Sequence, residues 1–318
     1  MTSEISDIDL AFTRKPGSGI RTEPTFSGAL SFARRRYSKD LEGVDLAVVG
    51  VPYDLATTGR PGARLGPRAV REASAMIAWD RVHGWEFDPF DALSVIDYGD
   101  VLFDPGLPAS IPVEIEAQFK AIHNMGVKTL MLGGDHFSSY PVIKSLAAYE
   151  KQPISLIHFD AHSDTWEDEN GRIDHGTMFY HAAKQGLVDP KHSVQIGIRS
   201  FNEKTHGFNI LSAEDVRHRG VDAVIKFIRN IVGDRPAYIT FDVDCLDPSM
   251  APGTGTPVIG GLSTMEAQLI LRGLRGINLK SADVVEVAPA YDHAQITSLA
   301  AATVAMNLVA LFAAGESK

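Results

Sequence analysis

The chain has 318 residues, of which 44% are hydrophobic and 22% charged, and a chain of this kind buries a large core. Its formal net charge of -10 argues against nucleic acid or an anionic membrane as the main partner and is compatible with a cationic substrate. The single cysteine, Cys245, excludes an intramolecular disulfide, and the start of the chain lacks a secretory pattern, so we expect a cytoplasmic protein.

The first 43 residues are polar and irregular, and we expect an N-terminal arm (1–43) followed by one domain (44–318). The arm contains the basic run Arg34-Arg35-Arg36. In so acidic a protein, a basic run this short indicates a solvated or subunit-contact surface rather than a nucleic-acid site.

Apolar runs alternate with helical patterns from residue 46 onward. Continuous apolar strands separated by helices predict an α/β fold with a mainly parallel, doubly wound sheet covered on both faces. In such sheets, ligands bind at the carboxyl ends of the strands. We expect strands at 46–51, 94–97, 129–132, 154–157, 194–198, 237–241 and 282–287, and helices beginning near Pro67 and at 111–125, 138–150, 222–232 and 264–274.

The segment 296–314 carries no charge and is long enough to raise a transmembrane interpretation. It is rich in alanine, however, and includes polar residues such as Thr303 and Asn307, and the chain has no second such segment. We therefore expect a buried helix on the sheet or at a subunit contact, and no membrane partner.

Three of the expected strands end in side chains that bind metals. Residues Asp160, His162 and Asp164 follow the strand at 154–157, and they share one face if the extended geometry persists past Phe159. Two more carboxylates with the same spacing follow the strand at 237–241, and a Gly-Gly turn places a histidine at the mouth of the strand at 129–132. The six candidate ligands are His136, Asp160, His162, Asp164, Asp242 and Asp244.

Four carboxylates and two imidazoles form a hard, oxygen-rich donor set that suits Mn²⁺ better than a thiolate zinc site does. Because crowded carboxylates repel one another, two divalent ions are the simple electrostatic solution. Two such ions would share a bridging water that ionises near neutral pH and supplies a hydroxide nucleophile. We interpret His158 as a core or ligand-supporting histidine, Asp135 as a turn or ligand-supporting carboxylate, and Asp247 as a turn residue.

These motifs resemble the three signatures of the ureohydrolase (arginase/agmatinase) family: Gly133 to His136, Phe159 to Asp164, and Phe241 to Pro248. Two further stretches, Ala251 to Leu262 and Val284 to Asp292, resemble the agmatinase branch. The resemblance implies an arginase-like three-layer α/β/α sandwich, two Mn²⁺ per subunit, hydrolysis of a guanidino group to urea, and a homo-oligomer, trimeric or hexameric.

Site roles follow from the same resemblance. It implies that His136, Asp160, Asp164 and Asp242 hold one ion and that Asp160, His162, Asp242 and Asp244 hold the other. Glu286 matches the carboxylate that holds the guanidinium, and a resonance-stabilised cation needs such an anionic clamp. His175 matches the catalytic histidine, which would protonate the leaving amine near pH 7. Asp164 would also accept a hydrogen bond from the hydroxide and carry its proton onward.

The substrate stays open between several guanidino compounds. Arginases carry a Ser-Gly-Asn element before the catalytic histidine that reads a carboxylate, whereas this chain has Glu169 to Asp174 there. The difference fits agmatine, which ends in an ammonium. Glu167, Asp168 and Glu169 would attract this ammonium unless they form only a solvated loop. Arg172 would pair with a carboxylate, and this keeps 4-guanidinobutyrate open as a substrate. We predict hydrolysis of agmatine to putrescine and urea. The alternatives are another ureohydrolase, acting on 4-guanidinobutyrate or arginine, and a metal-binding relative without turnover.

Overall fold

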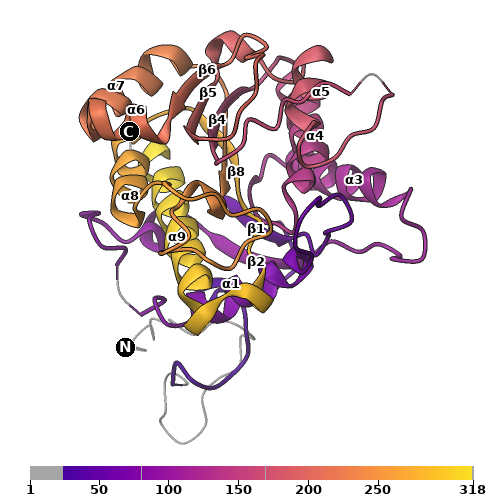
Figure 1. The fold of residues 1–318 in the computed structure, drawn as a ribbon. Coiled ribbons are helices and arrows are strands. Elements are labelled where there is room, and N and C mark those ends of the chain that lie inside the picture. The colour runs from indigo at the N-terminus through magenta and orange to yellow at the C-terminus, as the bar shows by residue number, and fades with distance from the viewer. Residues whose placement is uncertain (1–23, 80, 169, 317–318) are drawn as a thin grey trace, which may run out of the picture.

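One eight-stranded sheet runs through the centre of the protein in the order β2-β1-β3-β8-β7-β4-β5-β6 (Figure 1). The computed structural model describes residues 24–79, 81–168 and 170–316. All neighbouring strands pair in parallel. The strands are β1 (Leu46–Gly50), β2 (Val95–Asp100), β3 (Lys128–Leu132), β4 (Ser155–Phe159), β5 (Val194–Ile198), β6 (Asn209–Ser212), β7 (Ala237–Asp242) and β8 (Leu279–Val285).

Helices cover both faces of the sheet and complete the predicted three-layer α/β/α sandwich (Figure 1). One face packs against α3 (Ile111–Asn124), α4 (Ser139–Glu150) and α5 (Met178–Lys184). The other face packs against α1 (Gly66–Ser74), α2 (Pro89–Ala92), α6 (Ala213–Arg219), α7 (Val221–Val232), α8 (Thr264–Gly273) and α9 (Ile296–Glu316). Short 3₁₀ helices lie at Phe32–Arg34, Ala63–Leu65, His136–Ser138, Pro190–His192, Val243–Cys245, Pro289–Tyr291 and His293–Gln295.

The apolar strands are explained by burial on both faces. In β1, Leu46 and Val48 pack into the core beneath α9, while Ala47 and Val49 pack into the core beneath α3. Since successive side chains point to opposite faces, a strand covered on both sides is apolar at most positions. The apolar runs that result allowed β1, β3, β4, β5 and β7 to be predicted from the sequence.

The uncharged C-terminal segment forms α9, which packs against α1, α8 and β8. It is long and apolar enough to span a membrane, but most of it is buried inside the protein. The expectation of a buried helix is therefore confirmed. Sequence reasoning missed the edge strand β6 and the short helices α5 and α6, because the three residues of β6 other than Leu211 are only half-buried and a seven-residue helix shows little periodicity.

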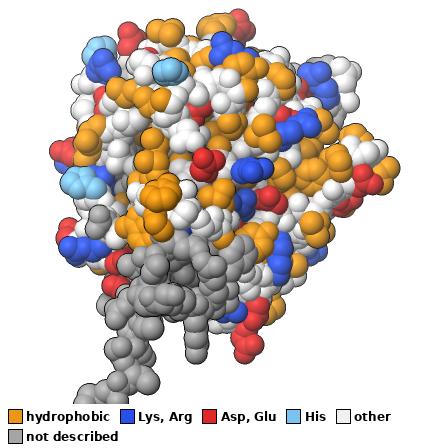
Figure 2. All heavy atoms as spheres, turned by 90° about the horizontal axis from the view of Figure 1, so that it is seen from below, with side chains coloured by type: hydrophobic (Ala, Val, Ile, Leu, Met, Phe, Trp, Pro, Cys, Tyr) orange, Lys and Arg blue, Asp and Glu red, His pale blue; other side chains and the backbone are white. Residues whose placement is uncertain are grey.

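Part of the segment before β1 packs against the rest of the protein. The backbone N–H of Phe32 donates to Asp97 Oδ2 at 2.7 Å, and Arg34 is fully buried, with its guanidinium donating to Ser27 O at 2.8 Å. The expectation that this basic run is solvated or at a subunit contact is therefore wrong for Arg34. Its Nη1 donates to two carbonyls of the same segment, Ser27 O and Ala29 O. On the face shown in Figure 2, basic, acidic and hydrophobic side chains are interspersed.

Candidate active site

The candidate ligands come together because their strands are neighbours in the sheet. The central order is β3-β8-β7-β4, so the loops that leave the carboxyl ends of these four strands lie side by side. His136 follows β3, Asp242 ends β7, and Asp160 follows β4. Glu286 follows β8, which lies between β3 and β7. Residues as far as 150 positions apart in the chain therefore meet at one edge of the sheet.

One group of donors surrounds His136, which is 1% exposed. Its Nδ1 lies 3.0 Å from Asp160 Oδ2, 3.0 Å from Asp164 Oδ2 and 3.3 Å from Asp242 Oδ2. This nitrogen has no partner that meets hydrogen-bond geometry among the described residues. A buried imidazole nitrogen facing three carboxylate oxygens is the arrangement expected of ligands around a divalent cation.

A second group lies beside the first. His162 Nδ1 lies 3.3 Å from Asp160 Oδ1 and 3.1 Å from Asp244 Oδ2. The two oxygens of Asp160 therefore face different histidines, His136 and His162. A carboxylate that offers one oxygen to each group is suited to bridge two cations, so the donor set fits the expected pair of ions.

The loop after β4 reaches this geometry by a turn. The strand ends at Phe159, and Asp164 has a left-handed backbone, with φ of 50°. The turn is closed by His162 N, which donates to Asp160 Oδ1 at 2.6 Å. The expectation of continued extended geometry is wrong, although Asp160, His162 and Asp164 do converge, because local hydrogen bonds replace strand pairing beyond Phe159.

Buried polar groups fix the ring of His136. Its Nε2 lies 2.7 Å from Thr240 Oγ1, which donates to Asp283 Oδ1 at 2.6 Å. Asp283 Oδ2 also accepts from the hydroxyls of Ser139 and Tyr238, each at 2.6 Å. Because the Thr240 hydroxyl donates its proton to the Asp283 carboxylate, it must accept from His136 Nε2–H. The lone pair of the His136 ring is then on Nδ1.

His158 lies where the sequence placed it, deep in β4, and its ring supports a candidate ligand. Its Nε2 lies 2.6 Å from Asp160 Oδ2, and its Nδ1 lies 3.0 Å from Gln195 Nε2. The ring is fully buried and close enough to His136, Asp160 and Asp164 to belong to the same potential metal-binding group. The ring of His158 therefore helps to fix the orientation of the Asp160 carboxylate.

The electrostatics of the cluster show that it needs compensating positive charge. Burial raises the pKa of Asp242, as do the charges of Asp244 and Asp160. Burial lowers the pKa of His162, but hydrogen bonds to Asp160 and Asp244 outweigh it and raise that pKa to about 12. In the metal-free protein, a protonated His162 offsets part of the negative charge, a task that bound cations would take over.

Glu286 and His175 lie beside the cluster. Glu286 is 1% exposed, and its Oε1 accepts from His136 N at 2.9 Å and lies 3.0 Å from His175 Nδ1. Its Oε2 is buried with no hydrogen-bond partner among the described residues. A buried carboxylate oxygen without a donor is costly unless a ligand supplies one.

The ring of His175 is held at both nitrogens. Thr58 donates its backbone N–H to His175 Nε2 at 3.0 Å, and Thr58 Oγ1 lies 2.7 Å from the same nitrogen. Burial lowers the pKa of His175, but the hydrogen bond to Glu286 and the charges of Glu286, Asp164 and Asp135 raise it to about 9. The Thr58 N–H directed at Nε2 favours the neutral ring and opposes this increase. The two partners of the ring, Glu286 and Thr58, therefore favour opposite protonation states.

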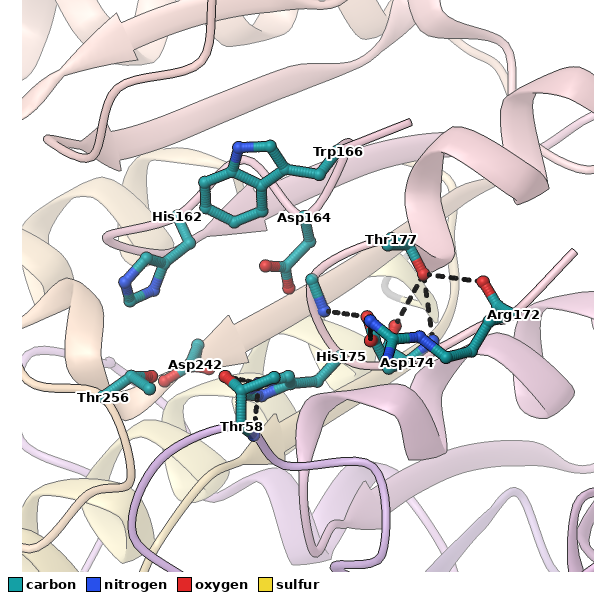
Figure 3. Close-up of a pocket in the computed structure, with 11 residues that line it drawn as sticks. Thr58, His162, Asp164, Trp166, Arg172, Asp174, His175, Thr177, Asp242 and Thr256 are labelled. Atoms are coloured by element: carbon teal, nitrogen blue, oxygen red, sulfur yellow. Dashed lines mark hydrogen bonds and ion pairs between the residues drawn. The ribbon is translucent and has the colours of Figure 1, made fainter. Parts of the chain in front are cut away.

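A cavity of about 310 Å³ joins these groups (Figure 3). His162, Asp164, His175 and Asp242 border the same space, and Trp166 borders its outer side. Sequence reasoning missed Thr58, Trp166 and Thr256, which also line it. Their spacing carries no signal of chemistry, because each lies in a loop whose path only the fold defines.

The rim of the cavity holds Arg172 between two acids. Arg172 Nη2 lies 2.9 Å from Asp174 Oδ2, and its Nε lies 3.5 Å from Asp168 Oδ2. Glu167 lies at 2.6 Å from Lys204 Nζ, so it is neutralised at the surface. Glu169 lies outside the described residues. The acids of this loop therefore pair with local cations.

Comparison with known proteins gives one consistent group. The arginase family model matches residues 44–310. An agmatinase from Chromobacterium violaceum is 50% identical over 312 residues, covering 98% of this chain and 97% of that protein. An agmatinase from Photorhabdus laumondii is 46% identical over 291 residues, covering 90% of this chain and 93% of that protein.

Solved structures agree with the sequence matches. A hypothetical agmatinase from Burkholderia thailandensis superposes with a TM-score of 0.92 at 54% identity, covering 96% of this chain and 97% of that one. Proclavaminate amidino hydrolase from Streptomyces clavuligerus gives 0.86 at 34% identity, covering 92% and 100%. An arginase from Bacillus cereus gives 0.72 at 27% identity, covering 84% and 98%.

Proposed function

This chain belongs to the arginase family, and from that premise we propose that it hydrolyses agmatine to putrescine and urea. The observation that carries the proposal is the buried, unpartnered Oε2 of Glu286, held beside His175 at a cluster of metal-binding side chains. An amidinohydrolase needs this combination: an anion for the guanidinium, a proton donor for the amine, and a source of hydroxide.

The donor set supports two Mn²⁺ per subunit. His136, Asp160, Asp164 and Asp242 would hold one ion, and Asp160, His162, Asp242 and Asp244 the other. When bound, the pair would supply a hydroxide nucleophile for the guanidinium carbon at neutral pH. Asp164, which lines the cavity, is placed to accept the proton of the nucleophile.

Glu286 would hold the guanidinium. Its Oε1 is already engaged by His136 N and by the ring of His175, so Oε2 is the oxygen left for a substrate N–H. A charge-assisted hydrogen bond in a buried site is stronger than a neutral one, and it orients the planar group. The clamp therefore accounts for both affinity and alignment.

His175 would deliver the proton to the leaving amine. An amide anion is far too basic to leave, so carbon–nitrogen cleavage requires a proton donor. Glu286 Oε1 anchors Nδ1, while Nε2 lies beside the Thr58 hydroxyl at the cavity wall. The ring thus has one nitrogen that fixes its orientation and one that exchanges protons.

The rim favours a substrate that ends in an ammonium. Arg172 is the only lysine or arginine among the lining residues described, and Asp168 and Asp174 already pair with it. A substrate carboxylate would have to displace one of these acids from Arg172, whereas an ammonium would not. Agmatine therefore fits better than 4-guanidinobutyrate or arginine.

Urea release after Mn²⁺ loading tests the proposal directly. We expect agmatine to be hydrolysed with at least a tenfold higher kcat/KM than arginine or 4-guanidinobutyrate. Equal or better turnover of 4-guanidinobutyrate would replace the substrate assignment. No urea from any of the three, in protein that holds two ions, would leave a metal-binding relative without turnover.

We also propose a cytoplasmic homo-oligomer, a trimer or hexamer, with a small cationic guanidino compound as its ligand. The buried state of the single cysteine, Cys245, supports a fold that needs no oxidising compartment. Light scattering coupled to gel filtration measures the number of chains, and a monomer would contradict the assembly.

A further inference from the structure

Arg199 stands one residue beyond β5 and makes an unusual set of contacts. Its guanidinium donates six hydrogen bonds of 2.6–3.3 Å, and all of the acceptors are backbone carbonyls. No carboxylate lies within ion-pair distance of it among the residues that the structure describes. A partly buried guanidinium ordinarily pairs with an acid, so its five N–H donors are here committed to shaping the backbone.

Apart from Gly197 O, which lies in β5, the carbonyls belong to two loops that border the candidate site. Arg199 Nη2 donates to Asp244 O at 2.6 Å and to Leu246 O at 3.2 Å, in the turn that carries the Asp244 carboxylate. The same guanidinium donates twice to Val258 O, from Nη2 at 2.7 Å and from Nε at 3.1 Å. One side chain therefore fastens the turn after β7 to the loop that follows it.

The second loop also reaches the metal-binding carboxylate. Thr256, two residues before Val258, donates its hydroxyl to Asp244 Oδ2 at 3.2 Å and lines the cavity. Fixing Val258 to the Asp244 turn thus also limits where Thr256 can lie. The side chain of Asp244 is held through its own backbone and through this hydroxyl.

The backbone at position 199 fastens a third segment. The N–H groups of Arg199 and Ser200 donate to Ala161 O at 2.9 and 3.1 Å, between Asp160 and His162. Ala161 N in turn donates to Asp244 Oδ1 at 3.0 Å. Gly197 has φ of 94°, and a Cβ there would lie 3.0 Å from Asp160 O, so the chain needs a glycine to approach this closely.

We propose that Arg199 is a positioning residue for one of the two cation sites, the one formed by Asp160, His162 and Asp244. The inference rests on the proposed function, because it assumes two cations. His136 and Asp164 lie outside this set of contacts, since His136 is fixed instead through Thr240 and Asp283. Loss of the guanidinium should therefore weaken one ion selectively rather than the whole centre.

The test is Mn²⁺ binding to metal-free protein, measured by calorimetric titration and by elemental analysis after gel filtration. We expect two ions in the wild-type chain and, in Arg199→Met, one ion at wild-type affinity and one weakened by about 10–100-fold, the range found when groups behind metal ligands are removed. Arg199→Lys should show the same selective loss, because an ammonium has three donors and no planar fork.

Arg229→Met is the matched control. Its guanidinium also donates to backbone carbonyls, but these belong to Gly273 and Arg275 at the end of α8. The variant should therefore bind two ions normally. Equal affinity for both ions in Arg199→Met and Arg199→Lys would overturn the inference alone, as would parallel weakening of both ions. Fewer than two ions in the wild-type protein would overturn the proposed function and the inference with it.

Discussion

Glu286 illustrates how single residues define this site. It follows β8 with a left-handed backbone, φ of 63°, although it is not a glycine. Such a conformation costs about 1–3 kcal/mol and persists only where the surroundings enforce it. Here Glu286 N donates to Gly134 O at 2.8 Å, and the side chain accepts from His136 N, so the turn fixes the carboxylate beside His136 and His175.

Replacing the charge of Glu286 should remove substrate binding and spare the ions. In Glu286→Gln the shape is kept, but the guanidinium loses its charged partner in a buried site, which costs about 2–5 kcal/mol or roughly 30-fold or more in affinity. Calorimetric titration with agmatine measures the loss, and elemental analysis should still find two ions. Glu116→Gln, whose carboxylate pairs with Lys144 far from the site, should bind agmatine normally. Unchanged agmatine affinity in Glu286→Gln would contradict the clamp.

His175→Asn should keep substrate and metal but lose proton transfer. We expect kcat to fall by roughly 10²–10⁴, the range for removal of a general acid or base. Steady-state assays of urea release against agmatine concentration separate kcat from KM. A variant with wild-type kcat would exclude His175 as the proton donor.

The same variant should change how stability depends on pH. The pKa of His175 is raised from 6.5 to about 9, so its protonated form stabilises the folded, metal-free protein. That contribution is complete below pH 6.5 and is lost as the pH rises to about 9, at about 1.4 kcal/mol for each pKa unit. Urea denaturation of EDTA-treated protein should show the wild-type unfolding free energy falling across this range relative to His175→Asn. Parallel curves for the two proteins would refute the raised pKa.

Thr240 should control metal affinity without touching a metal. Thr240→Val removes the hydroxyl that joins His136 Nε2 to Asp283, so the ring is no longer fixed with its lone pair on Nδ1. We expect Mn²⁺ affinity to fall by about 10–100-fold. Thr129→Val deletes a buried hydroxyl of β3 that contacts Ser281 instead, and it should leave affinity unchanged in the same calorimetric titration. A similar loss in both variants would indicate general loosening.

At the scale of elements, the sequence predicted the strands and helices that have a regular hydrophobic pattern, and it missed the paths of the irregular loops. Apolar runs identified the buried strands, and spacing identified the candidate ligands, because both depend on local periodicity. The path of the loop after β4 was wrong, since the positive φ of Asp164 leaves no trace in the composition. The contacts of Thr58 and Arg199 could not be predicted either, because their partners lie 117 and up to 59 residues away in the chain.

Helix α9 is held in the core by one amide as well as by apolar contacts. Asn307 is fully buried, and its Oδ1 accepts from Trp85 Nε1 at 3.0 Å and from Arg272 Nε at 3.3 Å. Asn307→Leu would leave one buried donor and one partly buried donor unsatisfied, so the free energy of unfolding should drop by about 1–3 kcal/mol. Chemical denaturation measures it, with Thr303→Ala as control, because that hydroxyl bonds only to Leu299 O of the same helix. Equal stability of both variants would contradict this role.

At the scale of the whole molecule, strand order determines both fold and chemistry. Parallel strands β3, β8, β7 and β4 are adjacent, so one edge of the sheet collects His136, Glu286, Asp242 and Asp160. The burial that stabilises the sheet also removes water from these acids. The folded protein therefore contains repelling carboxylates that its apolar core must offset.

Removing the ions should consequently destabilise the entire fold. Each site saturated at about 100 times its dissociation constant adds about 2.7 kcal/mol, so two sites together add roughly 5 kcal/mol. With about 2 °C per kcal/mol for a large domain, EDTA should lower the Tm by about 10 °C, and Mn²⁺ should restore it. Asp160→Asn, which removes the carboxylate shared by both groups, should show a much smaller restoration in the same thermal scan. If neither EDTA nor Mn²⁺ changes the Tm of the wild-type protein, the acids are neutralised by protons alone. The cluster would then not hold divalent ions.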